Sequence, residues 1–171
     1  MIRIFTIIFG FIFFFSSCIK EEVFREDSTE EDVVNNNSDI ENNDSDSPTV
    51  VMEKQVVKIV NAERAKLKLE PLLIDESLMK SCDIRAKETA VKFSHDRPDG
   101  KSFTTAIEIS YSAVGENIAY GQNSAEDVMK SWMNSEGHRN NILSTRFTHI
   151  GVGCYENNNR LYWVQLFIQK K

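Results

Sequence analysis

A run of acidic residues limits the part of this chain that can fold. Between Lys20 and Ser47 there are eleven Asp or Glu residues against two basic ones, and the few apolar side chains show no period. High net charge with low hydrophobicity buries too little surface to offset the entropy of ordering, so the segment is predicted to be a disordered tether. About 30 flexible residues span roughly 30 Å. A compact domain is therefore expected only in the residues that follow.

The residues before the tether are typical of an export signal. Arg3 precedes an apolar run from Ile4 to Phe15, which has the length of a signal-peptide core. A membrane-spanning helix needs about 20 residues, so this run is too short to span. The run ends at Ser16-Ser17-Cys18, and a cysteine directly after small residues resembles a bacterial lipobox. Phe15 in place of the usual leucine resembles the relaxed lipoboxes of spirochaete lipoproteins.

The lipobox resemblance implies cleavage before Cys18 and acylation of that cysteine, with palmitate as one expected chain. Several acyl chains, at about 0.8 kcal/mol per buried methylene, would anchor the protein durably to a bilayer. An ordinary signal peptide with an incidental cysteine is the alternative. The predicted organisation is a lipoprotein signal peptide over residues 1–17, a lipidated and acidic tether over 18–48, and one domain over 49–171.

The charge of the chain belongs mainly to the tether. The whole chain carries −6 at pH 7; Arg3 carries +1 and the segment 20–47 carries −9, which leaves +2 for the residues from Pro48 onward. This nearly neutral part has no basic stripe, so nucleic acid is not an expected partner. Its 124 residues suffice for a single domain with a real core, and a monomer is expected.

Helices are predicted first along the domain and strands last. Apolar residues at helical spacing indicate a helix over Met52–Leu69 that stops near Pro71. Asp75 is a predicted N-cap for a second helix, and Ser124 with Asp127 resembles a capping box at the start of a third. The second helix has the apolar stripe Leu78, Cys82, Ala86, Ala90 and Phe93.

The last part of the chain changes to a strand pattern. Ile150–Cys154 alternates, and Leu161–Ile168 is nearly continuous apolar sequence, as in a strand covered on both faces. Glu156–Asn159 suits the hairpin turn between them, because asparagine tolerates left-handed backbone. Helices are therefore expected on both faces of a small sheet. The glycines after His95 are interpreted as tight turns around polar residues.

Two cysteines remain after Cys18. Cys82 and Cys154 lie on apolar faces, where a free thiol behaves as a small hydrophobe. An oxidising compartment would also permit a disulfide between them. The sequence leaves both states open.

Six motifs occur in order after the tether and together resemble one family. They resemble the bacterial branch of the CAP superfamily (cysteine-rich secretory proteins, antigen 5 and pathogenesis-related 1), also called the SCP domain. The resemblance covers nearly the whole domain and implies an α+β fold, a single three-layer α-β-α sandwich. The motifs are Asn61–Arg64, His95–Gly100, Gly115–Ile118, Trp132–Leu143, Ile150–Gly153 and Tyr162–Gln165.

Two imidazoles and a carboxylate are the candidate site. His95, Glu116 and His138 lie in segments with glycines nearby, and each matches a member of the family's central cleft tetrad. Converging, they could hold a divalent metal such as zinc, or the carboxylate could orient an imidazole as a general base. The fourth member is a glutamate in the family and is Ser135 here. The adjacent Glu136 is interpreted either as its substitute or as a surface residue.

Other polar and aromatic residues receive structural interpretations. His95 or His138 could instead tie loops together, and His149 is expected to be exposed beside Ile150. Five polar residues are expected to hold turns and helix ends by side-chain hydrogen bonds: Asn61, Arg64, Asn117, Arg139 and Asn141. Trp132, Trp163 and Phe167 are predicted core residues.

Three classes of function remain open at this point. The favoured hypothesis is a non-enzymatic binding module, anchored to the bacterial outer membrane at the cell surface. Its cleft lined by His95, Glu116 and His138 is expected to bind a lipid, a sterol or an extracellular protein. A periplasmic location is the alternative. The second class is a metal-dependent, protease-like hydrolase that uses the same cleft, although no serine or cysteine lies in an elbow motif. The third is a structural envelope lipoprotein.

Overall fold

Residues 46–171 are described by a computed structural model, and the predicted signal peptide, Cys18 and the tether up to Ser45 lie outside them. The described part contains four α-helices, one short 3-10 turn and four strands. No helix among these residues is long and apolar enough to span a membrane. The elements are α1 (Pro48–Lys66), β1 (Leu73–Ile74), α2 (Glu76–Val91), η1 (Phe103–Ala106), β2 (Tyr111–Tyr120), α3 (Ala125–Asn134), α4 (Glu136–Ile142), β3 (His149–Asn157) and β4 (Arg160–Lys170).

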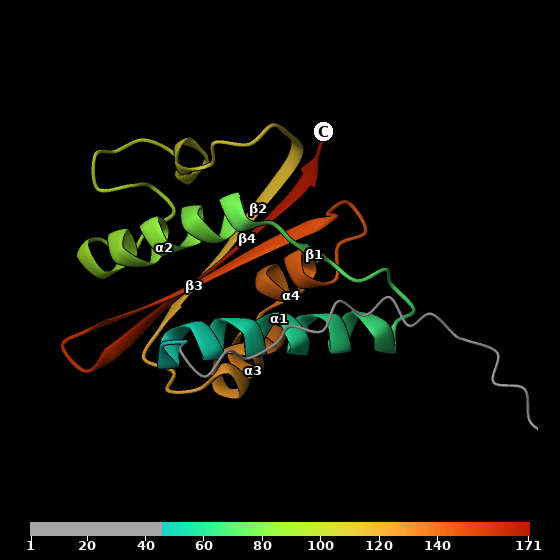
Figure 1. Cartoon of the computed structure of the whole chain (residues 1–171), viewed down its shortest axis with the longest axis horizontal. Helices are drawn as coiled ribbons and strands as arrows, with labels where there is room; N and C mark the ends of the chain where they lie inside the picture. Colours follow the sequence, from blue (N-terminus) through green and yellow to red (C-terminus); the bar gives the residue numbers. More distant parts are fainter. Residues whose placement is uncertain (1–45) are drawn as a thin grey trace, which may run out of the picture. The chain divides into compact units, whose positions relative to one another are not determined.

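The sheet lies between two layers of helices. Its strand order is β1-β3-β4-β2, with β1 parallel to β3 and the other pairs antiparallel. One face packs against α2, and the other packs against α1, α3 and α4 (Figure 1). The expected three-layer α-β-α sandwich of a single α+β domain is confirmed for residues 46–171.

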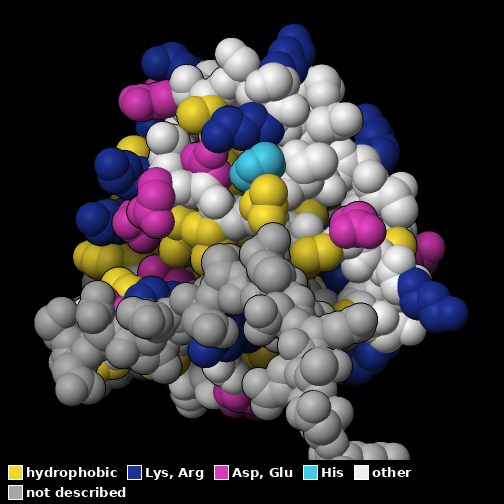
Figure 2. All heavy atoms as spheres, turned by 45° about the vertical axis from the view of Figure 1, so that its right-hand side comes forward, with side chains coloured by type: hydrophobic (Ala, Val, Ile, Leu, Met, Phe, Trp, Pro, Cys, Tyr) yellow, Lys and Arg dark blue, Asp and Glu magenta, His cyan; other side chains and the backbone are white. Residues whose placement is uncertain are grey.

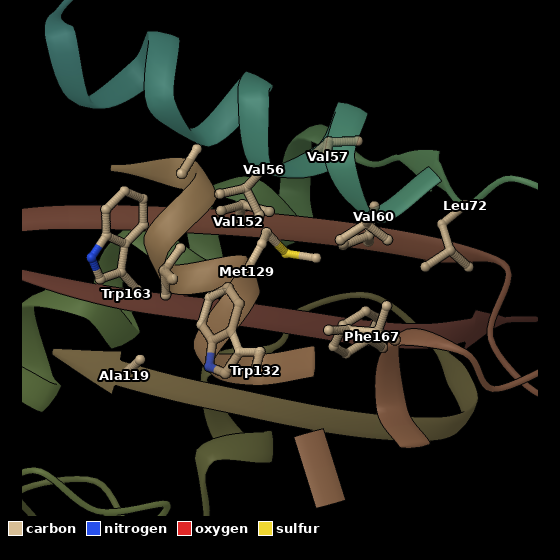
Figure 3. Close-up of a cluster of buried hydrophobic side chains, with 14 of the residues drawn as sticks. Val56, Val57, Val60, Leu72, Ala119, Met129, Trp132, Val152, Trp163 and Phe167 are labelled. Carbon is tan, nitrogen blue, oxygen red and sulfur yellow. The ribbon is translucent and has the colours of Figure 1, made fainter. Parts of the chain in front are cut away.

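Strand β4 supplies side chains to both cores. Trp163 and Phe167 lie in the core under α1 and α3, together with Trp132 of α3 (Figure 3). Val164 and Leu166 point to the α2 layer. Because a strand alternates its side chains between two faces, burial of both faces requires the continuous apolar run seen in the sequence. The prediction of a doubly covered strand and of these three core aromatics is confirmed.

The helix starts follow their capping residues. Asp75 accepts hydrogen bonds from the backbone N–H groups of Ser77 and Leu78, and Ser124 accepts one from Asp127, as predicted. Helix α1 begins four residues earlier than predicted, because Ser47 caps it and Pro48 suits the first helical position.

Both early helices end sooner than the sequence patterns predict. The φ angle of Lys68 is +56°, which takes the chain out of α1 before Leu69. Helix α2 ends at Val91, so Phe93 lies beyond the helix and is exposed rather than part of the apolar stripe. The first three stripe residues are fully buried, as predicted: Leu78, Cys82 and Ala86.

Strand β2 and several glycines differ from the predictions. The segment Tyr111–Tyr120 pairs with β4 along its length, so Glu116 lies within a strand and not in a turn. Gly115, Gly151 and Gly153 also lie in strands. The predicted turn is confirmed at Asn158 and Asn159, which both have positive φ.

The two cysteines of the described part are free thiols on opposite faces of the sheet. Cys82 of α2 belongs to the core on the α2 side, whereas Cys154 of β3 belongs to the core under α1 and α3. A disulfide between them would have to pass through the sheet. This geometry therefore favours the interpretation of both cysteines as small buried hydrophobes.

A buried carboxylate joins α1 to β3. Glu53 is only 4% exposed, and its Oε1 accepts a hydrogen bond from the backbone N–H of Cys154 at 2.7 Å. Burial raises the pKa of Glu53 to about 7; the Cys154 hydrogen bond opposes this rise and the nearby charge of Asp83 adds to it. Folding therefore favours the protonated form of this carboxyl group.

The Glu53→Gln variant is expected to be more stable than the wild type above neutral pH. The pKa of Glu53 is about 7 in the folded protein and has an ordinary value of 4.5. The protonated carboxyl group therefore stabilises the folded state fully below pH 4.5, and this contribution is lost as the pH rises through about 7. Glutamine keeps an oxygen for the Cys154 N–H and carries no charge. Urea unfolding should show a gain on the order of 2 kcal/mol at pH 8 and near equality at pH 4. Glu70→Gln, at an exposed position, is the control, and a pH-independent difference for Glu53→Gln would contradict this account.

Candidate functional site

Glu116 is held between a buried arginine and an exposed histidine. It lies on the α2 face of β2, where Arg85 Nε donates to its Oε1 at 2.8 Å. His95 Nδ1 is 2.7 Å from the other oxygen, Oε2. The side chains of Arg85 and Glu116 are 0% and 1% exposed, whereas that of His95 is 57% exposed. The predicted contact of His95 with Glu116 is present, and Arg85 binds the same carboxylate.

Arg85 continues the network toward the loop that carries His95. Its Nη1 donates to Glu88 at 2.7 Å and its Nη2 donates to the backbone oxygen of Ser94 at 2.9 Å. Arg97 in turn donates to Glu88 at 2.7 Å. A guanidinium has five N–H donors in a fixed plane, so this single side chain fixes a carboxylate, a helix residue and a loop together.

Arg85 was not among the site residues predicted from the sequence, although its position in the sequence indicated a buried charge. It lies on α2 three residues after Cys82 and directly before Ala86, both of which belong to the apolar stripe. A charged side chain next to a buried helical stripe requires a partner in the core. The Gly115–Ile118 motif, with its carboxylate, was the available partner.

The two imidazoles of the site have opposite pKa shifts. The hydrogen bond to Glu116 raises the pKa of His95, against the effect of partial burial. Burial lowers the pKa of His138, and the charge of His95 lowers it further. The structure thus joins two of the three predicted residues, His95 and Glu116, by a hydrogen bond. His138 lies on α4, and its side chain makes no hydrogen bond to either of them among the described residues.

Amide side chains place α4, and therefore His138, against β2. Asn117 Nδ2 donates to the backbone oxygen of His138 at 3.1 Å. Asn141 Nδ2 donates to Asn117 Oδ1 at 2.8 Å and to the backbone oxygen of Glu116 at 3.3 Å. The structural role predicted for both asparagines is confirmed.

The other residues interpreted as structural also bind backbone groups. The amide of Asn61 pairs with both the N–H and the C=O of Leu72. Arg64 is buried and donates to three backbone oxygens, and Arg139 donates to the backbone oxygen of Met133. His149 is half-buried rather than exposed, with Nδ1 at 2.9 Å from Thr148 Oγ1.

The arrangement does not fit a three-ligand zinc site. Across residues 46–171, no group of three His, Cys, Asp or Glu side chains is placed to hold a metal ion. Both oxygens of Glu116 already bind Arg85 and His95, and a guanidinium 2.8 Å away opposes a second cation. Glu136 is exposed at the start of α4, after Ser135. Among hydrogen bonds of the described residues, none joins Glu136 to His95 or Glu116.

The larger of two described cavities lies elsewhere, between α1 and α3. This groove of about 540 Å³ is apolar on Ile59, Met129 and Met133, and its lining does not include the three predicted site residues. Polar side chains complete it: Gln55, Glu63, Glu126, Lys130 and Asn134. The second cavity, of about 390 Å³, includes Leu73 and Phe147. Figure 2 shows acidic and basic side chains interspersed with hydrophobic ones on the face that it presents.

The fold and the ordered motifs agree with comparisons to known proteins. The chain belongs to the cysteine-rich secretory protein family, CAP, whose model matches residues 57–167. It is 50% identical over 123 residues to the uncharacterised protein YkwD of Bacillus subtilis strain 168, covering 69% of this chain and 47% of that one. The chain therefore spans about half the length of that relative.

Several solved structures share the fold. An extracellular protein containing an SCP domain from Bacillus anthracis superposes with a TM-score of 0.66 at 28% identity, over 71% of this chain and 41% of that one. An outer surface protein of Borrelia burgdorferi gives a TM-score of 0.64 at 24% identity, over 73% of this chain and 97% of that one. The predicted family and fold class are confirmed.

Proposed function

We propose that this protein is a non-enzymatic binding module, held outside the cytoplasm by acylated Cys18, and that its CAP domain takes up the apolar chain of a lipid. The observation that carries the proposal is the groove between α1 and α3. Its volume of about 540 Å³ falls in the range of small-molecule sites, which is roughly 300–1,000 Å³. The proposed ligand site is thus this groove rather than the histidine region.

The apolar part of the groove suits an acyl chain. Of the two carboxylates in the lining, Glu63 is paired with Lys66 and Glu126 accepts a hydrogen bond from Gln55. Ile59, Met129 and Met133 supply apolar contacts, and methionine adapts to ligands of irregular shape. Lys130 also lines the groove and is exposed, so its ammonium can pair with a carboxylate at the solvent end. A sterol or an extracellular protein segment remains a distinguishable outcome of the binding experiment.

The state of Glu116 and of the two buried thiols counts against their direct use in hydrolysis. Glu116 is buried with both oxygens engaged, so it can orient the exposed His95 but cannot itself exchange a proton with a substrate. The nucleophile of a cysteine hydrolase is a thiolate. Burial raises the pKa of Cys154 to about 12 and that of Cys82 well above its ordinary value, so neither thiol is activated.

Binding of dodecanoate tests the proposed groove. Displacement of a fluorescent fatty acid should show saturable binding to the 46–171 domain, weakened about tenfold in Met133→Gln because an amide replaces an apolar contact. Met52→Gln is the matched control, since Met52 is equally half-buried but lies outside the groove. Lys130→Glu should weaken dodecanoate and leave dodecanol unaffected. Equal binding by all variants would place the site elsewhere. Binding of a sterol but not of dodecanoate would refute an acyl chain as the ligand.

The proposed location is the outer membrane at the cell surface, with the periplasmic face as the alternative. The similar proteins from Bacillus anthracis and Borrelia burgdorferi are named as extracellular and outer surface proteins. In cells fed an alkyne-labelled palmitate, the full chain should carry the label and sediment with membranes. Cys18→Ser should lose both, and Cys82→Ser should lose neither. Labelling that persists in Cys18→Ser would refute anchoring at this residue.

A further inference from the structure

We propose that three amide side chains, two of them buried and one half-buried, couple occupation of the groove between α1 and α3 to the position of α4 and His138. The claim that a bound ligand moves α4 rests on the proposed function. The claim that Met129 and α4 are coupled in the protein without ligand does not. The amides belong to Gln165 of β4, Asn117 of β2 and Asn141 of α4. They form a continuous hydrogen-bonded path from the groove to the imidazole region.

The path begins at a groove residue. Met129 lines the groove although it is only 1% exposed, and its Sδ accepts a hydrogen bond from Gln165 Nε2 at 3.5 Å. Gln165 is 0% exposed, so this amide has no access to water. Met133 also lines the groove, but no hydrogen bond among the described residues joins its side chain to Gln165. Movement of Met129 is therefore expected to disturb the buried Gln165 amide, whereas movement of Met133 is not.

The path continues across the sheet to α4. Gln165 and Asn117 face each other on β4 and β2, and Gln165 Oε1 accepts from Asn117 Nδ2 at 3.0 Å. The same nitrogen donates to the backbone oxygen of His138, while Asn117 Oδ1 accepts from Asn141. Asn117 is 0% exposed. The orientations of the Gln165 and Asn117 amides are consequently set by their neighbours, because in both the oxygen faces a donor and the nitrogen faces an acceptor.

A change at Met129 cannot be absorbed locally. A ligand that displaces its sulfur leaves the buried Gln165 nitrogen without an acceptor, and a buried donor without a partner is costly. Rotation of the Gln165 amide toward another acceptor withdraws Oε1 from Asn117. Asn117 then loses one of the contacts that fix its nitrogen beneath His138. The amides are therefore expected to rearrange together.

Helix α4 is the element that can respond. It has seven residues, and no side-chain hydrogen bond caps its N-terminus. Its attachment to β2 includes the bonds from Asn117 and Asn141 described above. A small change in those bonds is thus expected to shift His138 relative to His95. By linkage, a shift of α4 also changes affinity for the groove ligand.

Two leucine variants without ligand test the path by NMR. Met129→Leu removes the sulfur acceptor at nearly constant volume, and Met133→Leu makes the same change beside it. In Met129→Leu, the side-chain NH₂ signals of Asn117 and the backbone amides of α4 should shift. Hydrogen exchange in α4 should accelerate about fivefold, at the lower end of couplings between sites. Met133→Leu should leave α4 unchanged. Identical effects of both variants, or none at α4, would overturn the inference.

A second arm adds dodecanoate. Saturating ligand should shift the α4 amides in the wild type and leave them unshifted in Gln165→Met. This variant lacks the amide and should still bind dodecanoate, as checked by displacement, because Gln165 lies outside the groove lining. An α4 shift that survives in Gln165→Met would overturn the path through this residue. Absence of dodecanoate binding to the wild type would refute the proposed function. The NMR comparison of Met129→Leu with Met133→Leu would still test whether Met129 is coupled to α4.

Discussion

Replacing Arg85 with leucine is expected to lower the free energy of unfolding by about 3–5 kcal/mol, because it leaves a buried carboxylate without its cation. Arg85 and Glu116 are 0% and 1% exposed in their side chains, and they are joined at 2.8 Å. Burial of an unpaired charge is far more costly than loss of a surface pair. Urea unfolding at pH 7 of the 46–171 domain measures the effect.

Two further variants separate the charge effect from simple loss of a side chain. Lys87→Leu changes an exposed lysine on the same helix, and it should alter stability by less than about 0.5 kcal/mol. The double variant Arg85→Leu with Glu116→Leu removes both charges, and it should recover more than half of the loss. A double variant as unstable as Arg85→Leu would mean that packing, not the unpaired carboxylate, sets the cost.

The Gly153→Ala variant is expected to cost about 3 kcal/mol, because α2 packs directly on this part of β3. A Cβ atom at Gly153 would lie 2.5 Å from the backbone carbon and oxygen of Cys82. A Cβ at Gly151 would lie 2.7 Å from the backbone of Leu78 in the same helix. These neighbours are backbone atoms, so the helix as a whole would have to move away from the sheet.

Gly137→Ala provides the contrasting control. Gly137 lies within α4, and a Cβ there meets no atom within 4 Å. Alanine is the better helix former, so this variant should gain about 0.5–1 kcal/mol. Thermal unfolding should therefore move in opposite directions for the two glycine variants. A loss below about 1 kcal/mol for Gly153→Ala would contradict the close packing of α2 on β3.

Local patterns predicted most of the elements because their causes are local. Asp75 and Ser124 cap helices with their own side chains, and the apolar run after Leu161 reflects burial on both faces of one strand. Strand β2 was missed, since a segment with Gly115, Glu116 and Asn117 lacks an apolar alternation. Its conformation is set by pairing with β4, 48 residues away in the case of Asn117 and Gln165.

The candidate site was anticipated only in part. The resemblance to the family brought His95, Glu116 and His138 together, and the 2.7 Å contact of His95 with Glu116 agrees with it. The role of Arg85 was not anticipated, and this residue changes the chemistry: a carboxylate bound to a guanidinium is an anchor for a loop rather than a metal ligand. The groove was not anticipated either, because it lies between two helices that are remote from each other in the chain.

Sequence alone established an acidic segment followed by one nearly neutral domain, the order of its helices and final strands, and the resemblance to a family. Those properties follow from composition and from the spacing of neighbouring residues along the chain. Packing in three dimensions settled which groups are charged partners, where a cavity opens, and that Cys82 and Cys154 lie on opposite faces of the sheet. Such relations depend on distances between segments remote in the chain, which no local pattern specifies.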